Sequence, residues 1–171
     1  MRFSSLNLCW LAAATFLLTL FSGCAHYQMG AANNPPFSTI YVAPAKTSAI
    51  IPQAQTVLTE QVRTALAQAG FKLASEDYAD VLLNLTLSDT AIQPAATASN
   101  DSGLGASYDV QLLVTYSLER QGGKALFSNR TASARQTVFA ADGFSQAKTQ
   151  AVPVITRRLA TKIADDVAST W

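Results

Sequence analysis

The sequence predicts an α+β domain, a two-layer sandwich in which two helices cover one face of a four-stranded mixed sheet, in the order β-α-β-β-β-α. Two patterns predict this fold. Residues 81–93 and 107–119 alternate apolar and polar side chains, as strands with one buried face do. Residues 52–69 and 145–169 repeat apolar side chains every three or four positions, as amphipathic helices do. One apolar sheet face and two apolar helix stripes are buried most economically in two layers.

The predicted domain begins with a strand at residues 39–43, a β-branched and aromatic run. Pro52 then begins the first helix, which is predicted to end near Ala69 with Gly70 as its C-cap. Residues 71–73 are compatible with a short edge strand. Since a right-handed helical crossover joins parallel strands, the first strand is predicted to lie parallel to the next main strand.

The strands at residues 107–119 and 125–140 complete the sheet as hairpins, and Gly122-Gly123 makes the tight turn between them. The small polar residues of the last strand leave its inward face open. One face of the two preceding strands is apolar, formed by Val81, Leu83, Leu85, Leu87, Tyr108, Val110, Leu112, Val114, Tyr116 and Leu118. Their opposite face is polar, formed by Asn84, Thr86, Ser88, Thr90, Asp109, Gln111, Thr115 and Ser117.

The connection at residues 94–106 is rich in Ala, Ser, Gly and Thr. It is long for a hairpin, and long loops in compact domains are commonly functional or disordered. The final helix is predicted from Ser145, its N-cap, to about Ser169. Pro153 is expected either to kink this helix or to mark its true first turn.

The N-terminus has the layout of a secretory signal. Arg2 precedes an apolar run over about residues 6–21, and small residues lie just before Cys24. The run is shorter than the ~20 residues that a helix needs to cross a bilayer. Residues 1–23 are therefore predicted to be a signal peptide and not a resident membrane span.

Ser22-Gly23-Cys24 resembles the bacterial lipobox, although Phe21 departs from its usual aliphatic residue. The resemblance implies that the signal is cut before Cys24 and that Cys24 carries acyl chains such as palmitate. Two or more such chains anchor a protein stably, where one binds only marginally. Ala25 is not the aspartate typical of inner-membrane retention, so the implied location is the periplasmic side of the outer membrane. The alternative is an ordinary secreted protein with a chance cysteine.

Composition excludes several classes of function. The chain has 12 Lys and Arg against 11 Asp and Glu, and Arg2 lies in the signal, so the remainder is formally neutral and presents no basic field to nucleic acid. Cys9 also lies in the signal, which leaves Cys24 alone and excludes disulfides and cysteine-metal sites. His26, the one histidine, is close to the anchor, so a histidine-based triad in the domain is excluded. The sequence predicts no enzyme, no cofactor and no metal site.

A series of short motifs resembles the LPS-assembly lipoprotein family LptE. After the lipobox come an aromatic-x-Met-Gly step at residues 27–30 and a Pro-Pro-Phe-x-Thr-Ile-x-Val-x-Pro segment at residues 35–44. An amphipathic helix that ends in glycine follows, and then the pair Ala79-Asp80 begins a strand. The residues before the first strand are small, polar and broken by Pro35-Pro36, so residues 24–38 are predicted to be a lipidated N-terminus with a flexible tether, and residues 39–171 an LptE-like domain.

The resemblance implies an outer-membrane lipoprotein that plugs the lumen of the β-barrel LptD, helps this barrel assemble, and binds lipopolysaccharide on its way to the cell surface. The polar face of the predicted sheet suits such a role because barrel lumens are polar. Two alternatives stay open: a periplasmic lipid-carrying accessory lipoprotein of an ABC transporter, and a structural subunit of a secretion pore. The first would need an apolar groove, and the second would need an oligomer.

Lipopolysaccharide-binding residues are predicted from the loops. The family's basic residues lie at a loop end of the sheet, but the hairpin connection here has no Lys or Arg and carries Asp101. The predicted strand directions bring three connections to one end, at residues 44–51, 94–106 and 141–148. Their only basic residues are Lys46 and Lys148, so these two are predicted to meet lipid A phosphates.

Overall fold

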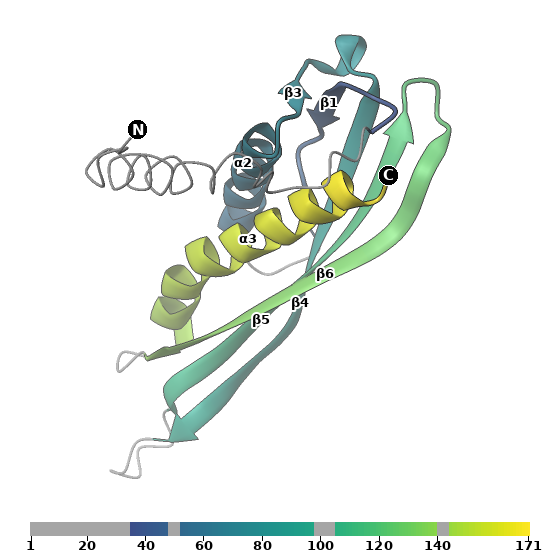
Figure 1. The fold of residues 1–171 in the computed structure, drawn as a ribbon. Coiled ribbons are helices and arrows are strands. Elements are labelled where there is room, and N and C mark those ends of the chain that lie inside the picture. The colour runs from purple at the N-terminus through teal and green to yellow at the C-terminus, as the bar shows by residue number, and fades with distance from the viewer. Residues whose placement is uncertain (1–34, 48–51, 98–104, 140–143) are drawn as a thin grey trace, which may run out of the picture. The chain divides into compact units, whose positions relative to one another are not determined.

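The computed structural model describes residues 35–47, 52–97, 105–139 and 144–171, and Figure 1 shows α2 and α3 covering the same face of one sheet. In chain order the elements are β1 Thr39–Val42, β2 Lys46–Thr47, α2 Pro52–Gln68, β3 Lys72–Leu73, the 3-10 turn η1 Glu76–Tyr78, β4 Val81–Thr97, β5 Gly105–Arg120, β6 Ala125–Phe139 and α3 Phe144–Ser169.

The strands are ordered β3-β1-β4-β5-β6, and β2 also pairs with β4, beyond the end of β1. β1 runs parallel to β4, with Ile40 opposite Val81 and Val42 opposite Leu83. β4, β5 and β6 pair antiparallel as successive hairpins. The predicted two-layer α+β fold, with its parallel first pair and its hairpins, is confirmed.

The described sheet has six strands, so the predicted number of four was wrong. The two additional strands, β2 and β3, are two residues long, which is too short for an alternating pattern to appear in the sequence. Lys72 and Leu73 of β3 pair with β1, where the sequence is compatible with a short edge strand. Lys46 and Thr47 of β2 pair with β4, although the sequence places them in a loop.

β4 and β5 are longer than the sequence predicts. β4 continues to Thr97 and β5 begins at Gly105, so the predicted loop at residues 94–106 is too long. The connection is residues 98–104, which lie outside the described residues. A hairpin rich in Ala, Ser and Thr lacks the apolar alternation that would have marked these strand ends.

Pro94 lies within β4, opposite Tyr108 of β5. Proline has no N–H, so it is confined to strand edges and bulges. Both conditions are met here. The register shifts next to Pro94, and no described strand pairs with the other edge of β4 beyond Leu87.

The core lies between the sheet and the helices. The inward residues that alternation predicts in β4 and β5, from Val81 to Leu118, are buried. The buried residues of β6 are Phe127 and Val138 near its ends and the small Ala132 and Ala134 in its middle, where α3 can approach the sheet. The helices contribute Leu58, Val62, Leu66, Ile155, Leu159, Ile163 and Val167.

α2 ends as the sequence predicts. Gly70 has φ +95°, a left-handed conformation that glycine adopts at little cost. The N–H of Gly70 donates to the carbonyl of Ala67 and that of Phe71 to the carbonyl of Leu66, each at 3.1 Å. This is the Schellman pattern, which satisfies the last carbonyls of the helix.

α3 runs from Phe144 to Ser169 and contains Pro153 in its interior. Pro153 therefore does not mark the first turn, which was one of its two predicted roles. Its carbonyl accepts a hydrogen bond of 3.3 Å from Nε2 of Gln61 in α2, which links the two helices at this position.

Candidate functional site

The face of the sheet opposite α2 and α3 carries a row of threonines. Thr86 of β4 lies opposite Thr115 of β5, and Thr115 lies opposite Thr131 of β6. Thr86 and Thr131 are exposed, and Thr115 is half-buried between its neighbours. Since paired residues present their side chains on the same face, three hydroxyl groups stand side by side across three strands.

This face opposite the helices, the polar face, contains the polar residues that alternation predicts. Its outward residues in β4 and β5 include Asn84, Thr86, Ser88, Gln111, Thr115 and Ser117, none of which is buried. Leu82 and Leu113 also face outward and are partly covered. The polar face is thus made largely of neutral hydrogen-bonding groups, with two leucines among them.

Lys46 belongs to the polar face. It pairs with Thr86 in the parallel β2–β4 ladder and is exposed, whereas its neighbour Ala45 is buried. It therefore extends the threonine row by one position. The sequence could not place it there, because a two-residue strand leaves no periodic signal.

Lys148 lies in α3, but its side chain is outside the described residues. α3 runs antiparallel to β6, since Arg158 contacts Arg135 and Lys162 contacts Ser133. Lys148 lies ten residues before Arg158, about 15 Å along the helix, beyond the end of β6. Lys46 is level with Thr131 of β6. Lys46 and Lys148 are therefore separated by roughly 25 Å along the strand direction.

The prediction that Lys46 and Lys148 share one end of the sheet is therefore wrong. β4 continues for eleven residues past Thr86 to Thr97, about 35 Å at the usual strand rise. Lys46 thus lies beside the middle of the long hairpin and not at its end. Whether either lysine binds lipopolysaccharide stays a prediction, as does lipidation of Cys24, which lies outside the described residues.

Asp80 fastens the start of β1 to the start of β4. Its Oδ2 accepts hydrogen bonds from the backbone N–H of Ser38 at 2.8 Å and of Thr39 at 2.9 Å, and from the Ser38 hydroxyl at 3.1 Å. The Asp80 N–H donates in turn to the Thr39 hydroxyl at 2.9 Å. These donors, first the Ser38 N–H and then the Thr39 N–H, lower the pKa of Asp80 to about 2.

Asp80→Asn is expected to lower the thermal midpoint by several degrees near neutral pH, because the neutral amide accepts these hydrogen bonds less strongly. A carboxylate whose pKa falls from 3.8 to about 2 on folding stabilises the fold fully above pH 3.8. That stability is lost as the pH falls toward 2. Thermal melts between pH 2 and 6 should show the difference shrinking with acid, while Asp77→Asn in the exposed turn η1 changes little. A pH-independent difference would contradict this.

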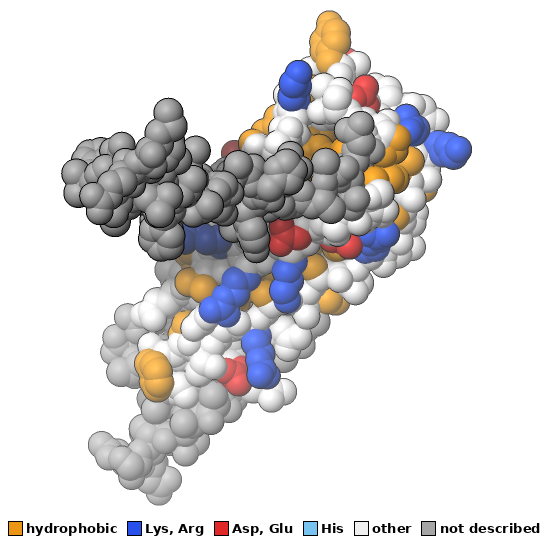
Figure 2. Space-filling view, viewed as in Figure 1, with side chains coloured by type: hydrophobic (Ala, Val, Ile, Leu, Met, Phe, Trp, Pro, Cys, Tyr) orange, Lys and Arg blue, Asp and Glu red, His pale blue; other side chains and the backbone are white. Residues whose placement is uncertain are grey.

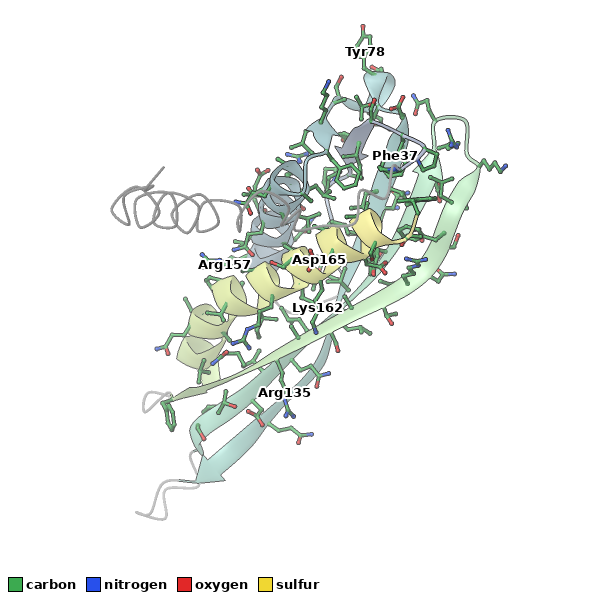
Figure 3. All side chains as sticks on the ribbon, in the orientation of Figure 1. Phe37, Tyr78, Arg135, Arg157, Lys162 and Asp165 are labelled. Carbon is green, nitrogen blue, oxygen red and sulfur yellow. The ribbon has the colours of Figure 1, made fainter. Side chains whose placement is uncertain are left out.

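Three aromatic rings hold the chain just before β1. Phe37 is 6% exposed. It stacks on Phe71 with ring centroids 5.5 Å apart and meets the edge of Trp171 at the same distance. The Trp171 indole N–H donates to the carbonyl of Val167 at 2.8 Å. Phe37 (Figure 3) therefore packs into the core of the domain, although the sequence assigns it to the tether.

A cluster of partly buried polar side chains joins the end of α3 to β5 and β6. Oδ2 of Asp166 accepts hydrogen bonds from the Tyr116 hydroxyl at 2.9 Å and from the Arg130 guanidinium at 2.7 Å. Burial, and then the bond to Asp166, raise the pKa of Tyr116 far above its usual range. The Arg130 guanidinium also lies 4.1 Å from the centre of the Phe127 ring. All these groups are engaged with one another, which is typical of a structural contact.

Two surface grooves are formed by the described residues. One, of about 470 Å³, lies between β6 and α3 and is lined by Gln111, Ser133, Ala134, Arg135, Arg158 and Lys162. The other, of about 370 Å³, lies between α2 and α3 and is lined by Gln61, Thr64, Ala65, Gln68, Arg157, Ala160 and Thr161. The first lining is polar and basic, and the second mixes polar side chains and Arg157 with two alanines. Neither is the apolar groove that a lipid carrier would need.

Over the residues that the structure describes, no group of three or more His, Cys, Asp and Glu could hold a metal ion. Within the same ranges, neither helix has the length and apolarity required to cross a bilayer. Figure 2 shows a surface of mixed polarity on the helix side, and basic side chains gather there over α3 and β6.

Comparison with solved structures supports the fold. A minor lipoprotein from Acinetobacter baumannii superposes with a TM-score of 0.52 at 17% identity, over 78% of this chain and 94% of that one. An uncharacterized lipoprotein B from Nitrosomonas europaea superposes with a TM-score of 0.55 at 13% identity, over 80% of this chain and 85% of that one. At such identities the likeness concerns the fold alone.

A search of curated proteins found no match. The family model described as LptE, lipopolysaccharide-assembly, matches residues 37–170. This match begins at Phe37, the first buried residue of the described part, and ends one residue before Trp171. It spans both the polar face and the Asp80 contacts. The chain therefore belongs to the LptE family of lipopolysaccharide-assembly proteins.

Proposed function

We propose that this chain is a lipoprotein on the periplasmic side of the outer membrane, anchored at Cys24, which plugs an LptD-type β-barrel and helps it assemble. The observation that carries this proposal is the polar face. Its threonine row, Thr86, Thr115 and Thr131, is presented by three long strands on the face opposite α2 and α3. Family membership supports a role in lipopolysaccharide assembly.

The side chains of the polar face are suited to contact with the lumen of a β-barrel. Barrel interiors are lined by polar residues. Short hydroxyl and amide side chains lose little conformational freedom on contact, and they can exchange hydrogen bonds to water for hydrogen bonds to a polar wall. Charged groups, which cost more to desolvate, are the minority on the face and include Lys46, Arg135, Asp109 and Glu119.

Charges placed on the polar face should abolish function. In cells depleted of the wild-type protein, Thr86→Arg/Thr115→Arg is expected to reduce co-purifying barrel at least ~10-fold, because an unpaired charge buried at an interface costs more than 1.4 kcal/mol. Surface lipopolysaccharide should fall with it. Both are measured on affinity-purified complexes and on intact cells.

The matched control is Thr64→Arg/Thr161→Arg, which adds the same charges at exposed positions on α2 and α3. It should behave as wild type. If the polar-face variant folds and still supports normal barrel recovery and surface lipopolysaccharide, the plug proposal fails.

Lys46 and Lys148 are proposed to bind lipid A phosphates. Lys46→Glu/Lys148→Glu should keep its barrel but bind lipopolysaccharide more weakly, since charge-assisted contacts are worth roughly 1.5–3 kcal/mol each. Because the two positions lie far apart, the single variants should have additive effects. Wild-type binding should weaken as salt rises. Unchanged binding by the double variant would remove both lysines from the site.

The pore-subunit alternative predicts a different partner for the same face. There, a second copy of this chain would cover the polar face, and purification without crosslinking would yield a ring of identical subunits. Affinity purification distinguishes the barrel plug from the pore subunit, because it identifies the protein that is bound.

A further inference from the structure

β6 is the last strand of the sheet, and no described strand pairs with its outer edge. Alternate residues of an antiparallel strand turn their N–H and C=O groups toward opposite neighbours. Two carbonyls on the outer side, those of Ser133 and Arg135, are reached by side chains of α3. An unpaired edge of this length is a ready template for another strand.

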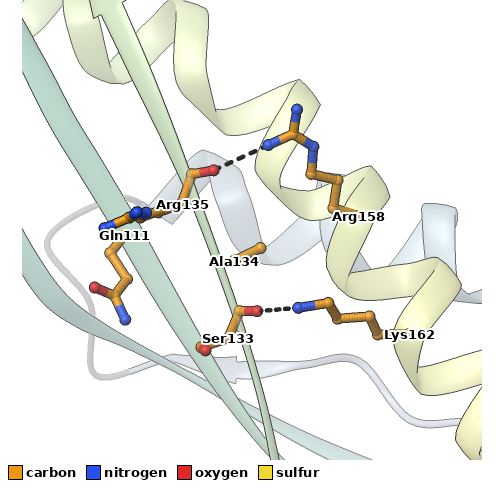
Figure 4. Close-up of a pocket in the computed structure, with 6 residues that line it drawn as sticks. All are labelled: Gln111, Ser133, Ala134, Arg135, Arg158 and Lys162. Carbon is orange, nitrogen blue, oxygen red and sulfur yellow. Dashed lines mark hydrogen bonds between the residues drawn. The ribbon is translucent and has the colours of Figure 1, made fainter.

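Arg158 and Lys162 cover those two carbonyls. The Arg158 guanidinium donates to the Arg135 carbonyl at 3.0 Å, and the Lys162 ammonium donates to the Ser133 carbonyl at 2.7 Å (Figure 4). The two residues are four apart on α3, so they lie on one face of the helix. Both side chains are exposed, and they cross the groove of about 470 Å³ between α3 and β6.

Neither cation is neutralised by a carboxylate within the described ranges, where the ion pairs are Arg63–Glu60 and Arg130–Asp166. A strand that approached this edge would have to displace both cations from the carbonyls. If the strand came from a second copy, it would also bring that copy's own Arg158 and Lys162 close. Lysine and other charges at sheet edges commonly prevent edge-to-edge association in this way.

The edge itself is suited to self-pairing. Its exposed outward residues include the uncharged Thr131, Ser133 and Thr137 and one cation, Arg135. A twofold axis at Ala134 would pair β6 with β6 antiparallel, placing Ser133 of each copy opposite Arg135 of the other. Such an isologous contact closes as a dimer.

We infer that the outer edge of β6 is a latent pairing surface for β6 of a second copy, and that Arg158 and Lys162 keep it closed. This inference does not rest on the barrel partner. Arg158 and Lys162 block the β6 edge of their own chain, so that the protein stays monomeric.

The test uses the purified mature lipoprotein in nonionic detergent, with protein mass measured by light scattering over a range of concentrations. Arg158→Ala/Lys162→Ala should form a dimer, with a dissociation constant at least ~10-fold lower than that of wild type. Arg157→Ala/Lys124→Ala removes two exposed charges that do not contact β6 carbonyls among the described residues, and it should stay monomeric. So should Arg158→Lys/Lys162→Arg, which keeps both donors.

Two additions locate the contact. Ser133→Cys/Arg135→Cys in the double alanine variant should form intermolecular disulfides, because positions 133 and 135 of the two copies face each other across the axis, whereas Thr161→Cys, on the exposed side of α3, should not. Ser133→Pro removes an edge N–H and should return the double variant to a monomer. A folded double variant, verified by its melting curve, that stays monomeric would overturn the inference. A dimer that Thr161→Cys crosslinks and Ser133→Cys/Arg135→Cys does not would overturn it as well.

Discussion

Leu112→Ala is expected to lower the free energy of unfolding by about 2–5 kcal/mol, the range seen when a buried leucine is truncated. Leu112 is fully buried at the centre of β5, between the sheet and the helices. Its truncation removes apolar contacts and leaves a cavity that flanking strands cannot readily fill. Urea or thermal unfolding of the purified protein measures the change.

The adjacent Leu113 provides the matched control. It carries the same side chain on the same strand but points to the polar face, where it is only half-buried. Leu113→Ala should therefore cost less than about 1 kcal/mol, since little cavity forms. Equal losses at the two positions would mean that the two faces of β5 are buried alike, contrary to the structure.

The difference between these neighbours is also why so much of the fold could be predicted. A strand with one buried face must alternate, and residues 81–88 and 108–118 alternate almost without a break. The end of α2 could also be predicted, because a glycine such as Gly70 readily adopts the left-handed conformation that ends a helix. The sheet, its polar face and both helices follow from these local signals.

Other features depend on contacts between residues far apart in the chain. Phe37 meets Trp171, and Asp80 binds Ser38, but no local pattern joins either pair. The position of Lys46 depends on a two-residue strand, and the length of β4 depends on bulges that interrupt its alternation. For the same reason, the contacts of Arg158 with β6 could not be foreseen from the charge pattern of α3.

Cys24→Ala is expected to remove the protein from the outer membrane almost completely. If Cys24 carries two or more acyl chains, each buried methylene contributes about 0.8 kcal/mol to membrane binding, and the variant loses all of it. The uncut precursor or a soluble periplasmic form should accumulate instead. Membrane fractionation and the intact mass of the N-terminus measure both outcomes.

Cys9→Ala is the control for this experiment, because Cys9 lies within the predicted signal peptide and should not affect lipidation. An unmodified N-terminus on the wild-type protein would rule out the anchor. A Cys24→Ala protein that remains in the outer membrane would show that another part of the chain, or its partner, is sufficient to hold it there.

The central claim is that the polar face lies against the wall of a β-barrel, and site-specific photo-crosslinking in living cells tests it most directly. A photoreactive residue at Thr115, or at its neighbour Thr86, should capture a large outer-membrane β-barrel protein identifiable by mass spectrometry. The same residue at Thr161, on the exposed side of α3, reports the opposite face of the domain. Capture from Thr115 of only a second copy of this chain, or of an inner-membrane component, would contradict the account.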